Sequence, residues 1–205
     1  NVAFLGETAA GRRGVVGSRR GPYDAPKGRV YRSAAAVKSK ITFITTGGTI
    51  SKTFDEHDGS LRNDRPVIEA ILAGLRLPDL EVYYRHVLSK DSLDLTDADR
   101  RLILETVREE LPRCNAVVIA HGTDTLAVTG ELILAEIPTP RVPIILTGAM
   151  RPYEFRDTDA DQNVTEALLA CRLAAPGVYA AMHNRLLRFP GVVKDRESLS
   201  FVKRR

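Results

Sequence analysis

From Lys40 onward, short apolar runs alternate along the chain with longer stretches in which apolar residues recur every three or four positions. The short runs are rich in Val, Ile and aromatic residues, which is typical of strands buried in a sheet. The longer stretches are typical of helices with one buried face. The pattern predicts strands at 41–45, 80–88, 115–120, 142–147 and 177–183, a last strand near 186–193, and helices at 66–75, 95–111, 124–136 and 161–173.

The ends of these segments carry residues that start helices. Pro66 stands in the first turn of the first predicted helix, where its fixed φ is favourable. Thr96 precedes the second helix as its expected N-cap, with acidic residues in the first turn. Because strands alternate with helices of ten or more residues, we expect a three-layer, doubly wound α/β fold, with a mostly parallel sheet and helices on both faces. In open sheets of this kind, ligands bind beyond the carboxyl ends of the strands.

The composition is that of an ordinary globular protein, with 205 residues, 43% hydrophobic and 27% charged. A chain of this length can bury a full core, and no apolar run approaches the roughly 18 residues that span a membrane. Two cysteines, Cys114 and Cys171, make neither a disulfide framework nor a zinc site, which favours a reducing, cytoplasmic environment. The four histidines lack the spacing of metal ligands, so we expect no metal.

The net charge of +4 is distributed unevenly. Residues 1–40 hold nine Lys or Arg and two acidic residues, a charge of +7, whereas the rest of the chain carries −3. A basic surface would suggest nucleic acid or an anionic membrane, but the body of the chain is mildly acidic and we expect neither partner. We interpret 1–40 as a disordered extension and 41–205 as the folded domain. The extension is compatible with a non-functional segment, a transit-type targeting segment or, less well, a nucleic-acid arm.

Glycine and threonine follow the first predicted strand, in Thr46-Gly47-Gly48-Thr49. Glycines let a backbone approach a ligand closely, and Thr49 adds a hydroxyl. An ordinary turn with Thr49 as a cap would leave the same pattern. A phosphate-binding loop is a further alternative, although neither Gly-x-Gly-x-x-Gly nor a Gly-Lys-Ser/Thr ending is present.

A second Gly-Thr step follows the third predicted strand, in His121-Gly122-Thr123-Asp124. Taken alone, it is equally compatible with a helix cap and a structural histidine. Together, the two steps would bring two hydroxyls, a carboxylate and free N–H groups into one crevice, because parallel strands end at the same edge of a sheet.

Polar residues also end the neighbouring strands. Residues 90–94 follow the second strand, residues 147–152 follow the fourth, and Lys194 stands near the end of the chain. A lone lysine is usually a solvated charge, and acids ahead of a helix usually stabilise its N-terminus. A threonine hydroxyl, however, becomes a nucleophile once a base removes its proton, and a buried Thr-Asp-Lys group could relay that proton. With an oxyanion held by backbone N–H groups at the turns, acyl transfer from an amide or ester is a coherent hypothesis.

Five features, in this order, resemble the bacterial-type L-asparaginases: Thr-Thr-Gly-Gly-Thr-Ile at 45–50, Asp-Ser-Leu-Asp at 91–94, His-Gly-Thr-Asp-Thr-Leu at 121–126, Thr-Gly-Ala-Met-Arg-Pro at 147–152, and the late Lys194. The resemblance extends from about Ile41 to Val202, and the chain looks most like short members that keep only the amino-terminal catalytic domain. The resemblance implies the α/β fold, hydrolysis of L-asparagine to L-aspartate and ammonia, no cofactor, and a homo-oligomer.

The resemblance also implies a role for each matching residue. Thr49 would be the nucleophile that forms a β-aspartyl enzyme. Thr123, Asp124 and Lys194 would form a relay that activates attack and water. The implied substrate-binding residues are Gly48, Ser92, Leu93, Gly122, Thr123, Asp124 and Ala149. Among them, Asp124 would hold the α-ammonium group, Ser92 the α-carboxylate, and N–H groups around Thr123 and Ala149 the oxyanion.

The sequence departs from the family pattern in three places. Phe54 stands where short members carry a loop Tyr that orients the nucleophile, and Leu93 stands where many members carry Gln or Ser. The smaller carboxyl-terminal domain, which in two-domain members helps to complete a neighbouring subunit's site, does not follow Lys194, so we expect a different assembly or a more open site. These departures keep two alternatives in view: a broader amidase acting on Gln as well as Asn, and a non-catalytic amino-acid-binding homologue.

Overall fold

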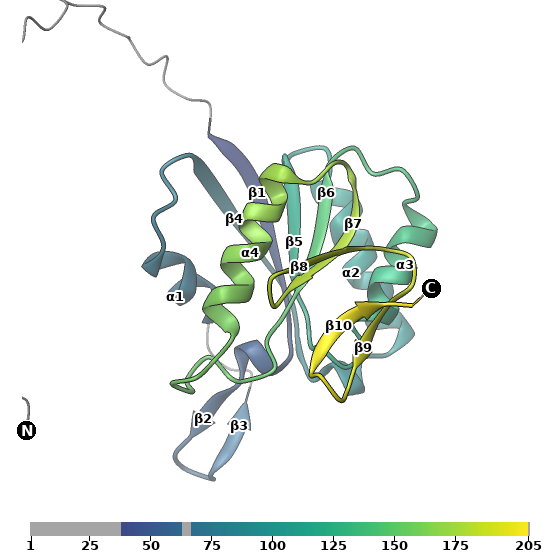
Figure 1. Ribbon diagram of the computed structural model, residues 1–205. Helices are drawn as coiled ribbons and strands as arrows, with labels where there is room; N and C mark the ends of the chain where they lie inside the picture. The colour runs from purple at the N-terminus through teal and green to yellow at the C-terminus, as the bar shows by residue number, and fades with distance from the viewer. Residues whose placement is uncertain (1–37, 63–66, 205) are drawn as a thin grey trace, which may run out of the picture. The chain divides into compact units, whose positions relative to one another are not determined.

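A six-stranded sheet runs through the centre of the fold in the computed structural model, which describes residues 38–62 and 67–204 (Figure 1). The strand order is β4-β1-β5-β6-β7-β8. The first five strands of this order pair in parallel, and β8 pairs with β7 in the antiparallel sense. The mostly parallel, doubly wound α/β fold is therefore confirmed. The strands are β1 (Ser39–Gly47), β4 (Leu80–Lys90), β5 (Ala116–Ala120), β6 (Pro143–Thr147), β7 (Gly177–Met182) and β8 (Arg185–Arg188).

Helices cover both faces of the sheet, as predicted (Figure 1). Successive residues of a strand point to opposite faces, so each buried strand serves two cores. Val118 of β5 packs with α1 (Val67–Gly74) and α4 (Ala160–Leu173). Its neighbours Val117 and Ile119 pack with α2 (Asp97–Glu110) and α3 (Leu126–Glu136). This double burial explains why the central strands are continuous apolar runs.

The predicted N-cap of the second helix is confirmed. The Thr96 hydroxyl accepts a hydrogen bond from the Asp99 N–H at 3.2 Å, and the Asp99 carboxylate accepts one from the Thr96 N–H at 2.8 Å. This capping box fixes the start of α2. Hydrogen bonds from Lys90 and from Thr96 lower the pKa of Asp99 to about 2. Pro66, expected in the first turn of the preceding helix, lies outside the described residues.

The prediction of one strand near 186–193 is wrong. The chain turns at Gly191, whose φ of 89° lies in the left-handed region, and this turn separates β8 from β9 (Val192–Asp195). Strand β9 pairs with β10 (Ser200–Lys203) in a separate hairpin. A second hairpin, β2 (Thr53–Asp55) with β3 (Ser60–Arg62), lies where only a loop was expected. Strands of three or four residues are too short to leave a periodic signal.

Among the described residues, no helix is long and apolar enough to cross a membrane. Within the same part of the chain, no group of three or more His, Cys, Asp or Glu residues is placed to hold a metal ion. The interpretation of residues 1–40 as an extension concerns residues that, apart from 38–40, lie outside the described ranges.

Candidate active site

Three loops at the carboxyl ends of β4, β1 and β5 approach so closely that only glycine fits between them. Gly48 has a φ of 84°, and a Cβ there would lie 2.4 Å from the Cα of Gly122. A Cβ on Gly122 would lie 2.5 Å from the Cβ of Ser92. Both glycines are therefore required by space, and Gly48 by its backbone conformation as well. The predicted convergence of the first and third strand ends is confirmed by these distances.

The loop that follows β6 joins the same group. A Cβ on Gly148 would lie 2.3 Å from the carbonyl oxygen of His121 and 3.3 Å from Cγ2 of Thr123. Ala149, the next residue, is almost completely buried. The loops that carry the predicted substrate-binding residues thus form one continuous cluster.

Lys194 reaches this cluster from the hairpin at the other end of the chain. Its Nζ lies 2.8 Å from Oγ1 of Thr123 and 3.0 Å from Oδ1 of Asp124. The Lys194 side chain is 14% exposed and Thr123 is 3% exposed, so solvent screens these contacts weakly. Lys194 is therefore not the solvated charge that a lone lysine usually is, and the three residues form a bonded group.

The start of α3 leaves Thr123 and Asp124 available to Lys194. Helix α3 begins at Leu126, and its N-cap is Thr125, which makes no side-chain capping hydrogen bond. The Thr125 hydroxyl instead donates to the carbonyl oxygen of Ser92 at 2.8 Å. The alternative in which Thr123 or Asp124 caps the helix is therefore not the observed arrangement.

Thr49 is held by its backbone rather than by its hydroxyl. It opens a 3₁₀ turn, Thr49–Ser51, that is anchored by the fully buried Ile50. Thr49 is partly exposed, and its hydroxyl has no hydrogen-bond partner in residues 38–62 and 67–204. The candidate nucleophile therefore stands at the edge of the loop cluster with its hydroxyl uncommitted.

Ser92 and Leu93 face in different directions. Ser92 is 1% exposed, and its Oγ is without a hydrogen-bond partner in the described part of the chain. A buried hydroxyl of this kind is expected to bind something. Leu93, by contrast, is 67% exposed. The structure thus brings Ser92 into the cluster and leaves the Leu93 side chain facing solvent.

An ion pair joins the loop after Thr49 to the turn that carries Ser92. Lys52 Nζ lies 2.7 Å from Oδ2 of Asp91, and Oδ1 of Asp91 accepts a hydrogen bond from the Leu93 N–H. The hydrogen bond from Lys52 is the main cause that lowers the pKa of Asp91, while partial burial opposes it. The pair connects two parts of the candidate site across 39 residues of sequence.

His121 is a structural residue. Its ring nitrogens lie 2.8 Å from the Gly122 carbonyl oxygen and 2.9 Å from the Thr129 hydroxyl. Burial lowers the pKa of His121 to about 4, so the ring is neutral at neutral pH. It supports the turn before Thr123 and does not need to take part in chemistry.

A polar network behind the β6 loop was not predicted. The Asp159 carboxylate accepts hydrogen bonds from the N–H groups of Met150 and Arg151 at 3.0 Å, and it lies 2.7 Å from Nε2 of His183. Asn163 donates to the same carboxylate and to the carbonyl oxygen of Gly148. Although burial raises the pKa of Asp159, these hydrogen bonds outweigh it and the pKa lies below its ordinary value. The network fixes the loop that carries Ala149.

The β2–β3 hairpin projects beside these loops (Figure 1). Phe54 is 50% exposed, and its N–H donates to Oε2 of Glu154 at 2.6 Å. Because a phenylalanine ring carries no polar atom, the Phe54 side chain cannot orient the Thr49 hydroxyl by a hydrogen bond.

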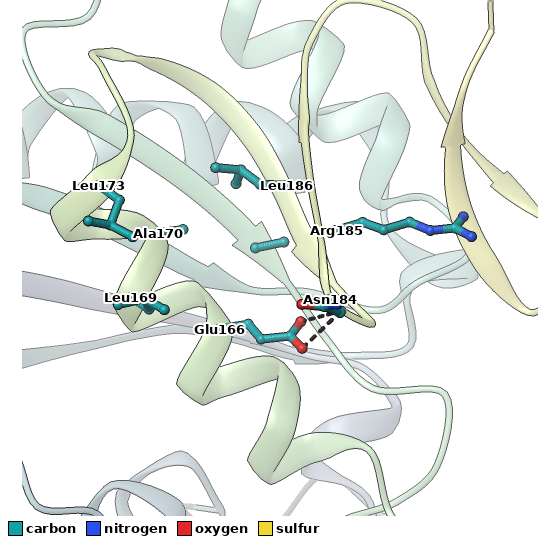
Figure 2. Close-up of a pocket in the computed structure, with 8 residues that line it drawn as sticks. Glu166, Leu169, Ala170, Leu173, Asn184, Arg185 and Leu186 are labelled. Atoms are coloured by element: carbon teal, nitrogen blue, oxygen red, sulfur yellow. Dashed lines mark hydrogen bonds between the residues drawn. The ribbon is translucent and has the colours of Figure 1, made fainter.

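A shallow apolar pocket lies elsewhere, between α4 and β8 (Figure 2). Leu169, Leu173 and Leu186 line it, and at one end the Glu166 carboxylate accepts a hydrogen bond from the Asn184 N–H (Figure 2). None of the predicted site residues lines this pocket. It is therefore a feature distinct from the loop cluster.

Fold and loop cluster together define an α/β domain that carries a bonded Thr-Asp-Lys group beyond the ends of its parallel strands. The family model described as "Asparaginase, N-terminal" matches residues 40–198. The chain belongs to the asparaginase family. The family resemblance that the sequence motifs indicated is thereby confirmed.

Two kinds of relatives are similar in sequence. An L-asparaginase of Thermococcus kodakarensis is 34% identical over 72% of this chain and 45% of its own length. A component of the glutamyl-tRNA(Gln) amidotransferase of Methanococcus maripaludis is 31% identical over 70% of this chain and 35% of its own length. The chain thus spans less than half of either relative.

Solved structures agree on the fold. The thermostable L-asparaginase from Thermococcus kodakarensis superposes with a TM-score of 0.73 at 32% identity, covering 80% of this chain and 51% of that one. L-asparaginase I from Vibrio cholerae superposes with a TM-score of 0.69, covering 81% and 51%, and at 23% identity this likeness concerns the fold alone.

Proposed function

We propose that this chain is the catalytic domain of an amidohydrolase that converts L-asparagine to L-aspartate and ammonia. The observation that carries the proposal is the group in which Lys194 lies within hydrogen-bond distance of both Thr123 and Asp124. An amine bonded to a buried hydroxyl can move a proton to and from a reacting group. Family membership favours the same chemistry.

In the proposed reaction, Oγ1 of Thr49 attacks the side-chain amide carbon of asparagine. A C–O bond forms, the amide oxygen becomes an oxyanion, and N–H groups around Thr123 and Ala149 stabilise it. The Thr49 proton leaves through the relay of Thr123 and Lys194 and reaches the leaving nitrogen, so that the C–N bond breaks and ammonia departs. Water, activated by the same relay, hydrolyses the ester and restores Thr49.

Substrate orientation follows from charge. Asp124 would hold the α-ammonium group, and Ser92, with its uncommitted hydroxyl, would bind the α-carboxylate. Gly48 and Gly122 leave room for the substrate backbone to approach the loops. Leu93 contributes through its main chain in this scheme, because its side chain faces solvent.

A second candidate is a broader amidase that also acts on glutamine. The similarity to a component of a glutamyl-tRNA(Gln) amidotransferase favours it. Asn and Gln differ by one methylene, which is worth only about 1–3 kcal/mol of discrimination. A third candidate is an amino-acid-binding homologue that does not turn over its ligand, since Phe54 lacks the hydroxyl of the usual loop Tyr.

An ammonia-release assay with L-asparagine and L-glutamine tests these candidates directly. The proposal expects ammonia from asparagine that disappears in Thr49→Ala and persists in Thr45→Ala, a nearby threonine whose hydroxyl contacts His86. Release from both amides at similar rates would favour the broader amidase. Thermal stabilisation by asparagine without ammonia would favour the binding homologue, and a gain of turnover in Phe54→Tyr would locate the defect.

We also propose that residues 41–205 act as one asparaginase amino-terminal domain in a cytoplasmic homo-oligomer, with no cofactor. Support comes from the family resemblance, since the family model begins at residue 40. Because this chain spans about half of the structure it resembles, size-exclusion chromatography with light scattering is the measurement that checks assembly. A monomer that is fully active would contradict the oligomer.

A further inference from the structure

Arg100 on α2 is a buried cation. It is 8% exposed. Its Nη1 donates to the carbonyl oxygen of Leu95 at 2.7 Å, whereas its Nε has no hydrogen-bond partner within residues 38–62 and 67–204. Within these same ranges no carboxylate lies within ion-pair distance of Arg100, unlike Arg85 and Arg108, which pair with glutamates.

A buried guanidinium without a counter-ion is unfavourable for folding. Charged groups removed from water need a partner of opposite charge or a full set of hydrogen bonds. If Arg100 had only a structural role in the helix, replacing it with an apolar residue would lower the stability of the fold little. Its presence is readily explained if an anion from outside the chain completes it.

The charge lies beneath the turn that presents Ser92. Arg100 holds Leu95, and the Leu95 N–H points to the carbonyl oxygen of Ser92 at 3.4 Å. Ser92 in turn adjoins Gly122, as the space between them shows. The charge is also felt at the end of β5, since it lowers the pKa of His121 in addition to burial. Arg100 therefore acts on the part of the cluster where Ser92 lies.

Nearby acids do not cancel this charge. Asp91 is paired with Lys52 at 2.7 Å, and Asp99 is paired with Lys90 at 2.9 Å. Asp94 and Asp97 are exposed, so solvent and salt screen their charges. The positive charge of Arg100 is thus left uncompensated on the side of Ser92.

We propose that Arg100 is a specificity-determining residue, whose buried charge makes the Ser92 turn attract the free α-carboxylate of an amino-acid amide. The inference rests on the proposed function in one respect, namely that Ser92 binds the α-carboxylate. Asp124 lies on the neighbouring loop and would attract the α-ammonium group. Arg100 and Asp124 would thus place positive and negative charge on the sides of the site where the zwitterionic substrate carries its carboxylate and its ammonium group. Arg100 acts through the field and through Leu95, not by contact with the reacting atoms.

The test compares Arg100→Met, Arg100→Lys and the control Arg101→Met, a change at the exposed neighbour on α2. The kcat/KM is measured for L-asparagine and for its α-amide, which lacks the carboxylate charge. We expect Arg100→Met to lower kcat/KM for asparagine about tenfold or more, mainly through KM, and to change the α-amide value less than about twofold. Arg100→Lys should recover part of the loss, and Arg101→Met should match the parent.

Binding measurements separate this inference from the proposed function. Calorimetry with L-aspartate and its α-amide, isoasparagine, needs no turnover. If the parent protein releases no ammonia yet binds L-aspartate more weakly after Arg100→Met, the hydrolase proposal fails and the role of Arg100 stands. Equal losses for the charged and uncharged ligands would assign Arg100 a structural role and overturn the inference. Unchanged affinity in Arg100→Met, or no L-aspartate binding by the parent, would overturn it as well.

Discussion

Two threonines on neighbouring loops, Thr49 and Thr123, are held in opposite ways. Thr123 is buried and bonded to Lys194. Thr49 is partly exposed, and its hydroxyl is uncommitted within the described ranges. The loop of Thr123 packs between β5, β6 and the β9–β10 hairpin, whereas the loop of Thr49 leads into the β2–β3 hairpin.

The difference shows which part of the site is built in advance. A proton relay, the role proposed for Thr123, works only when its members stay within hydrogen-bond distance, so a rigid setting suits that proposal. A nucleophile, the role proposed for Thr49, must change partners during the reaction, so an uncommitted hydroxyl suits that proposal. The fixed region comprises the loops after β5 and β6 with Lys194, and the adaptable region comprises the loop after β1 with its hairpin.

The strongest test addresses the fixed region. Lys194→Met removes the amine of the relay and should lower kcat for ammonia release by about 10²- to 10⁴-fold, the range ascribed to positioned acid–base groups. Lys203→Met, on the partner strand β10, is exposed and should leave kcat unchanged. Full activity in Lys194→Met would remove the relay from the mechanism.

Gly122→Ala tests the close contact between the loop after β5 and the turn that carries Ser92. The new methyl group would meet the Ser92 Cβ at 2.5 Å, and overpacking of this kind costs about 1–3 kcal/mol. We expect a lower free energy of unfolding and weaker asparagine binding. Gly74→Ala, where nothing lies within 4 Å, should be neutral or stabilising by about 0.5–1 kcal/mol. Denaturant titration of both variants makes the comparison, and equal effects would contradict the close approach.

The support of the fixed region is tested by Asp159→Asn. An amide cannot accept all the hydrogen bonds that the carboxylate accepts from Met150, Arg151, Asn163 and His183. Leaving a buried donor unpaired costs about 1–3 kcal/mol; because several of these donors are only partly buried, we expect a loss in the lower part of that range and a shift of urea unfolding to lower denaturant. Asp161→Asn, an exposed change in the first turn of α4, just after Asp159, provides the matched control. A shift of the same size in both variants would show that the network does not matter.

The smallest effect is expected in the adaptable region. Lys52→Met removes the ion pair with Asp91, whose partial exposure limits its contribution to below about 1 kcal/mol. Because Lys52 lowers the pKa of Asp91, the pair stabilises the fold above the ordinary carboxylate pKa and stops doing so as pH falls through the lowered value. Urea unfolding at pH 7 and at pH 3 should show a difference between variant and parent that shrinks in acid. If the stability difference between Lys52→Met and the parent grew in acid, the ion pair with Asp91 would not be its cause.

Much of the fold could be predicted because the central strands are buried on both faces and therefore appear as unbroken apolar runs. The hairpins could not be predicted in this way. Strand β9 offers only Val192 and Val193 before Lys194, and the turn at Gly191 is hidden in what looks like one strand. The local pattern of apolar residues indicates which face of a segment is buried. It does not indicate which partner a short segment pairs with.

The same limit applies to the site. The family resemblance singled out Thr49, Thr123 and Lys194 as candidates; Thr49 and Thr123 follow β1 and β5, whereas Lys194 lies within β9. The Asp159 network was not recognised. Met150 and Arg151 stand in the motif at 147–152 but contribute only backbone N–H groups, and His183 lies 24 residues from Asp159. Only the Asp159 position, shortly before a predicted helix, could have suggested a cap. Arg100 falls in an amphipathic helix, where a charged residue is ordinarily assigned to the solvent face.

The hydrogen bond between Thr123 and Lys194 joins residues that are 71 positions apart in the chain. A ribosome that has made the loops after β1 and β5 has already produced both threonines but has not yet produced Lys194, whose amine bonds to Thr123. Contacts of such high sequence separation form late in folding. If the proposed hydrolysis holds, nascent or partly unfolded chains would therefore carry the candidate substrate-binding loops without the amine of the proposed relay, and catalytic competence would arrive as the final event of maturation.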